Sequence, residues 1–177
     1  PGATGHSLTS APAIFDGVVA YQDPGSEVSA IYLVQPSRLA KAAAVAQEPG
    51  ADIQDQPSLA DGLIAFKQAY SGGSSFHVRL FSFTVAEDGT FSFQEVLDTG
   101  ELSTTRNSDQ FKPQVYGNRT SWTLVWEDDR GGTTGIHGYR SGGREFQVSS
   151  NTGAKNPAIS EDLVVWEELV SGTYSIR

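Results

Sequence analysis

The sequence predicts an all-β protein in which a unit of four antiparallel strands recurs about four times. Prolines stand at positions 12, 57, 113 and 157, so they recur every 45, 56 and 44 residues, about the length of one propeller blade. An apolar residue follows each proline by two positions, and a turn and a second apolar strand come next. All four of these second strands end in an aromatic residue: Tyr21, Phe66, Trp126 and Trp166.

A single four-stranded sheet leaves both faces exposed, so repeated sheets of this kind stack face to face around an axis. We therefore expect a β-propeller, or part of one, with blades at about 11–55, 56–111, 112–155 and 156–177. The four aromatic residues should hold the same place in successive sheets and be largely buried between blades.

Each blade then has its expected strands. Blade one supplies 13–15, 18–22, 30–34 and 42–47, where the repeat outweighs the helical propensity of the alanine-rich stretch 39–46. Blade two supplies a long hairpin, 76–85 and 90–97, whose phenylalanines at 81, 83, 91 and 93 alternate and should pack against neighbouring blades. Blade three carries four extra residues near 119–122, an acidic turn at 127–132 and a fourth strand at 146–148.

Blade four stops within its third strand, which leaves an open sheet edge and an uncovered blade face. We therefore expect a piece of a larger propeller of about six to eight blades, completed by the rest of a precursor or by a second copy of the chain. The alternative is a four-bladed ring in which the N-terminal segment 6–9 supplies the missing strand, but Leu8 precedes Pro12 by only four residues, which leaves little chain to cross between blades. The chain contains no methionine, which is expected of a processed or excised piece.

Two segments closely resemble the repeats of TolB-like β-propellers. They are the run from Trp126 to Gly132 followed by Gly135-Ile136-His137, and the run from Asn156 to Ser160 followed by Val164-Val165-Trp166-Glu167. The chain departs from that pattern because Arg130 has no counterpart in the other copies. The resemblance implies a propeller in an exported, periplasmic or cell-surface protein that binds protein partners.

Charge, residue content and spacing argue against nucleic-acid binding, a metal site and a membrane span. The net charge of −9 and the pI near 4.7 oppose nucleic-acid binding. The chain has no cysteine, and His6, His77 and His137 lack zinc-type spacing, so we expect no metal site and no cofactor. No apolar run is long enough to span a membrane.

The sequence contains no recognisable catalytic motif, so we expect no catalytic residues in this chain. The function that fits best is a non-catalytic recognition or assembly module that binds a protein partner. Two alternatives stay open: the propeller portion of a peptidase or glycan-active enzyme whose catalytic residues lie elsewhere, and a lectin that binds glycans.

Loop length varies most at 70–75, 98–109 and 119–122, and variable loops on a rigid scaffold are where recognition usually lies. We therefore expect surface contacts from four residues of blade three: Trp122, Asp128, Asp129 and Arg130. The acidic turn itself is expected to be solvated surface.

Overall fold

A computed structural model describes residues 10–23, 29–38, 42–45, 51–70, 75–102, 108–130, 132–149 and 153–177. The chain forms four antiparallel sheets, three with four strands and the last with three. Within each sheet the strand order follows the chain order, as expected of propeller blades. The predicted all-β propeller architecture is confirmed.

The first two blades contain eight strands and two short 3₁₀ segments. Blade one consists of β1 (Ala13–Phe15), β2 (Val18–Asp23), β3 (Ala30–Val34) and β4 (Ala43–Ala44), with η1 (Pro36–Arg38) between β3 and β4. Blade two consists of β5 (Ala51–Ala60), β6 (Leu63–Tyr70), β7 (Phe76–Val85) and β8 (Phe91–Asp98), followed by η2 (Thr99–Glu101).

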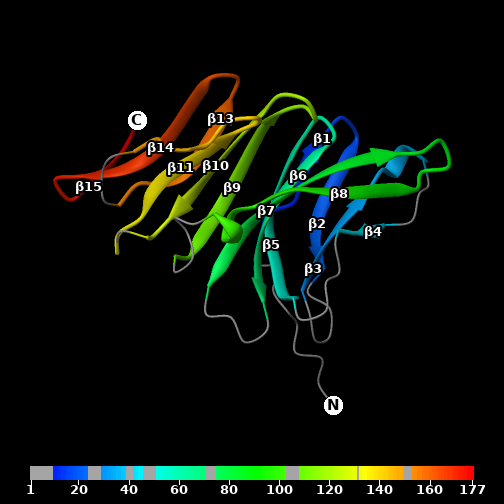
Figure 1. Cartoon of the computed structure of the whole chain (residues 1–177), viewed down its shortest axis with the longest axis horizontal. Coiled ribbons are helices and arrows are strands. Elements are labelled where there is room, and N and C mark those ends of the chain that lie inside the picture. Colours follow the sequence, from blue (N-terminus) through cyan, green and yellow to red (C-terminus); the bar gives the residue numbers. More distant parts are fainter. Residues whose placement is uncertain are drawn as a thin grey trace, which may run out of the picture.

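Blades three and four contain seven strands. Blade three consists of β9 (Gln110–Gly117), β10 (Trp122–Asp128), β11 (Gly135–Arg140) and β12 (Glu145–Gln147), and blade four of β13 (Lys155–Ser160), β14 (Leu163–Val170) and β15 (Thr173–Ile176). The sheets stack in chain order with their first strands alongside one another, so blades one and four lie at opposite ends (Figure 1).

The expected strands of blade one are found, with β4 at 43–44 where local propensity favoured a helix. Residues 39–41, 46 and 47 lie outside the described part of the chain. The expected hairpin of blade two is also confirmed, and its phenylalanines pack against blade one. Residues 71–74 and 103–107 of the expected loops at 70–75 and 98–109 lie outside the described part of the chain.

The four aromatic residues occupy the same register position in their sheets. Tyr21 pairs with Tyr32, Phe66 with Arg79, and Trp126 with His137 across the second and third strands. Trp166 exchanges both backbone hydrogen bonds with Arg177 in the same way. This part of the repeat prediction is confirmed.

The core lies between the blades. One cluster joins blades one and two and includes Ile31, Leu33 and Phe66, and a second joins blades two and three through Leu80, Leu124 and Trp126. A smaller third cluster joins blades three and four. Phe66, Trp126 and Trp166 therefore each face the preceding blade.

That direction corrects the expected burial of two aromatics. Phe66 and Trp126 are completely buried, but Tyr21 and Trp166 are only half-buried. Tyr21 lies on the face of blade one that has no preceding blade, where its ring stacks on Tyr32. Trp166 packs against the smaller third cluster, which covers its ring incompletely.

Two glutamines at equivalent positions join neighbouring blades. Gln54, three residues before Pro57, accepts a hydrogen bond from the backbone of Ile31 in blade one at 3.0 Å. Gln110, three residues before Pro113, accepts one from Val78 in blade two at 3.0 Å. Both side chains are buried, so the bonds fix the relative placement of successive blades.

Candidate functional site

The acidic stretch of blade three lies mostly inside the protein. Glu127 and Asp128 belong to β10 and are 6% and 1% exposed, and the equivalent Glu168 of blade four is 5% exposed. Each pairs with a base: Glu127 with Lys112, Asp128 with Arg130, and Glu168 with Arg177. The expectation of a solvated acidic turn is therefore wrong, because buried carboxylates need such partners.

Asp128 accepts several hydrogen bonds. One comes from the Trp126 indole at 3.1 Å, and two from the Arg130 guanidinium at 2.7 and 2.9 Å. Burial by itself would raise the pKa of Asp128, but the hydrogen bonds and charge of Arg130 and the bond from Trp126 outweigh it and lower the pKa. Asp128 is consequently a charged structural group.

Arg130 joins this carboxylate to a second one. Its guanidinium lies 2.5 Å from Glu145, which also contacts His137 Nδ1 at 3.1 Å. Burial, followed by the charge of Arg130, lowers the pKa of His137. Arg130 thus pairs with both carboxylates, and the cluster links β10, β11 and β12.

The structure brings together only part of the expected contact set. Trp122 is 8% exposed and stacks on Tyr139, so its expected surface position is wrong, as is that of Asp128. Asp129 and Arg130 are half-buried, and Asp129 accepts a hydrogen bond from the Asp109 backbone at 2.7 Å. Trp122 starts β10 and is covered by neighbouring strands, which local sequence does not reveal.

A polar chain of contacts lies where the first strands of the blades meet. Gln56, Lys112 and Asn156 each precede a proline and each has a positive φ, of 55°, 47° and 53°. Gln56 Oε1 accepts from the Lys112 backbone at 2.6 Å, and Lys112 Nζ donates to Asn156 Oδ1 at 2.5 Å. These residues border a hollow of about 390 Å³ but already satisfy one another, so we assign them to blade packing.

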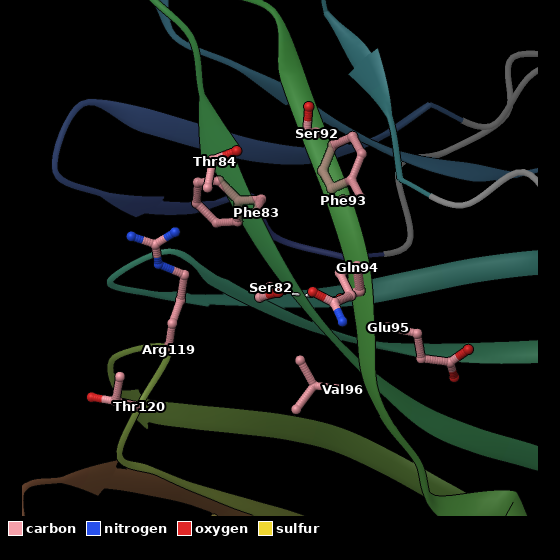
Figure 2. Close-up of a pocket in the computed structure, with 10 residues that line it drawn as sticks. All are labelled: Ser82, Phe83, Thr84, Ser92, Phe93, Gln94, Glu95, Val96, Arg119 and Thr120. Carbon is pink, nitrogen blue, oxygen red and sulfur yellow. Dashed lines mark hydrogen bonds between the residues drawn. The ribbon is translucent and has the colours of Figure 1, made fainter.

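A larger hollow, which we call the hairpin hollow, lies between the blade-two hairpin and the β9–β10 turn of blade three (Figure 2). Its volume is about 860 Å³, within the range of ligand-binding clefts. The hairpin contributes two cross-strand pairs of polar side chains, Ser82 with Gln94 and Thr84 with Ser92. The turn contributes one cation, Arg119.

Unequal strand lengths leave this face of the hairpin uncovered. The outer strands β7 and β8 have 10 and 8 residues, whereas β11 and β12 of the next blade have 6 and 3. Thr84, Ser92 and Gln94 are therefore exposed. The opposite face of the hairpin is apolar and packs on blade one.

Arg119 is held by its surroundings. Asn118 Oδ1 accepts hydrogen bonds from the backbones of Thr120 and Ser121 at 2.9 and 3.0 Å, which fixes the turn. A Cβ atom added at Gly62 would lie 3.1 Å from the aliphatic stem of Arg119, so the glycine makes room for that side chain. Within the described part of the chain, its guanidinium has no ion pair or hydrogen bond.

Both end faces of the stack expose apolar side chains. On blade four, Leu163 is 66% exposed, Tyr174 49% and Ile176 70%. On blade one, Ile14 is 71% exposed, on the face that also carries Tyr21. By register, Leu163 and Ile176 correspond to Val18 and Ile31, which pack between blades one and two.

The described residues contain no cluster of three or more side chains suited to a metal ion. Among the described helices, none has the length and apolar character needed to cross a membrane.

Comparisons with known proteins indicate the fold alone. No protein-family model matches the chain, and no curated protein is similar to it in sequence. TolB from Acinetobacter baumannii shares 15% identity and a TM-score of 0.58, over 93% of this chain and 39% of that one. A structure from a study of two prolyl endopeptidases shares 12% identity and a TM-score of 0.60, over 95% and 25%. The chain thus spans well under half the length of either, and its fold is that of propeller proteins.

Proposed function

We propose that this chain is a non-catalytic recognition module of an exported or cell-surface protein and that it binds a protein partner in the hairpin hollow. One observation carries the proposal: the elements that depart from the repeat come together. The long hairpin of blade two and the inserted turn of blade three border the same hollow. Elements that vary on a repeated scaffold are where recognition usually lies.

The exported setting is supported by the acidic composition and by the TolB-like repeat pattern. A protein partner is supported by the shape of the hollow, which is open and bordered by strands rather than enclosed. Its polar side chains can donate and accept hydrogen bonds along an extended segment of a partner.

The module also has an assembly surface. The exposed end faces carry apolar side chains at the sheet positions that pack between blades elsewhere in the chain. The partner that fits each face is therefore another blade. When this chain is alone in solution, we infer that a second copy supplies it.

The recognition proposal can be tested with two matched variants. Gln94 and Gln147 are both exposed glutamines on outer strands, but only Gln94 borders the hairpin hollow. Peptides selected from a random library on the wild-type chain should bind Q147W as well as wild type and should lose affinity for Q94W. Equal binding to both variants would contradict the assignment, and turnover of peptidase or glycosidase substrates would contradict a non-catalytic role.

A further inference from the structure

We propose that Arg119 makes the hairpin hollow a receptor for a carboxylate, carried by an acidic side chain or the C-terminus of an extended peptide. This inference rests on the proposed function and names the chemistry of the segment that binds. It depends on one cation that is carried by a hydrogen-bonded turn, is accessible, and has no charged partner among the described residues.

The first step is the state of the guanidinium. Two arginines elsewhere in the described chain are matched: Arg79 with Glu95 at 2.7 Å, and Arg130 with Asp128 and Glu145. Arg119 is exposed, and in the described part of the chain nothing pairs with it. Its planar group therefore offers forked donors that suit a carboxylate.

The second step is the direction of approach. On one side, Arg119 borders a smaller hollow of about 260 Å³ together with Asp16 and Asp61. On the other side it extends toward Thr84 of the hairpin (Figure 2). Glu95 also borders the hairpin hollow, and it forms an ion pair with the buried Arg79, which also lies 3.4 Å from Asp98. Because Asp16 and Asp61 would repel an anion in the smaller hollow, an anionic ligand approaches Arg119 from the hairpin side.

The third step is the class of ligand. Ser82 and Thr84 alternate on β7, and their cross-strand partners Gln94 and Ser92 alternate on β8. Alternate residues of a strand recur at about 6.6–6.8 Å, which is also the spacing of like-facing backbone groups in an extended peptide. The rings of Phe83 and Phe93 pack in the core shared with blade one, so they form no stacking platform for a sugar. An extended peptide fits these groups better than a glycan does.

Labelled short peptides, with Asp or Glu at one position or the amide Asn or Gln in its place, provide the probes. The wild-type chain should bind the acidic peptides about tenfold more tightly than the amides, since one charge-assisted pair distinguishes them. R119Q should remove that preference, and R119K should restore only part of it because lysine lacks the fork. R144Q, which removes an exposed arginine outside the hollow, is the control for net charge.

A second pair of variants tests the position of Arg119 without changing its charge. Gly62 and Gly17 both have positive φ, of 65° and 73°, but an added Cβ atom would meet Arg119 at Gly62 and would meet nothing within 4 Å at Gly17. G62A should weaken acidic-peptide binding, whereas G17A, with similar backbone strain, should leave it unchanged.

The outcomes separate this inference from the proposed function. If acidic and amide peptides bind equally well and Q94W abolishes both, the hollow binds peptides and the role of Arg119 is refuted. Equal loss of acidic-peptide binding in R119Q and R144Q would also refute it. If no peptide binds and a glycan array shows binding that Q94W abolishes, both proposals fail.

Discussion

Replacing Trp126 by alanine tests blade packing most severely, because the same replacement can be made at an equivalent position that lacks a covering blade. Trp126 is completely buried against blade two, and its indole donates to Asp128 at 3.1 Å. A buried tryptophan truncated to alanine costs about 3–5 kcal/mol, and the lost hydrogen bond lies within that range. We expect W126A to lower the free energy of unfolding by about 4 kcal/mol.

Tyr21 provides the matched comparison. It has the same register as Trp126, but it is half-buried on the open face of blade one, so Y21A should cost only about 1–2 kcal/mol. Urea unfolding followed by circular dichroism, at a dilution that keeps the chain monomeric, measures both values. Equal losses for the two variants would show that the aromatics are not packed in the order described.

Two further predictions concern buried polar groups. Because the pKa of Asp128 is lowered in the folded protein, its contribution is present above the unfolded pKa of about 3.9 and is lost as pH falls through the folded value. D128N should therefore be less stable by about 3 kcal/mol at neutral pH and show a flatter acid unfolding curve; parallel curves for variant and wild type would refute this. Q54L should cost about 1–3 kcal/mol by removing the acceptor of Ile31, and Q110L less, because Thr99 also accepts from Val78; thermal unfolding that ranks them in reverse would contradict the inter-blade role.

Much of the fold could be predicted because the repeat encodes it. Proline and aromatic spacings placed Phe66 and Trp126 in one register, since a one-residue slip would move every side chain to the other face. The same spacing contains a further signal, because a glutamine three residues before Pro57 and Pro113 marks the bonds between blades. Which face of a strand meets which blade is not encoded locally, so the half-burial of Tyr21 could not be predicted.

The site was harder to predict because it depends on what is left uncovered. Trp122 and Asp128 stand in a variable, acidic part of the sequence, yet neighbouring strands bury both. The inserted turn was expected to be a recognition element, but the residues in it that border the hollow are Arg119 and Thr120, not Trp122. Only the difference in length between the hairpin and the outer strands of blade three reveals that hollow.

The two end faces are the most direct consequence of the four-blade stack, and sedimentation equilibrium tests them. Because each face has the apolar pattern of an interior blade, the chain alone should associate to at least twice its 18.9 kDa mass. Charging the blade-four face, with L163K and I176K together, should return it to a monomer, whereas the exposed-site change Q147K should not. A wild-type chain that remains an 18.9 kDa monomer at all accessible concentrations would contradict the account.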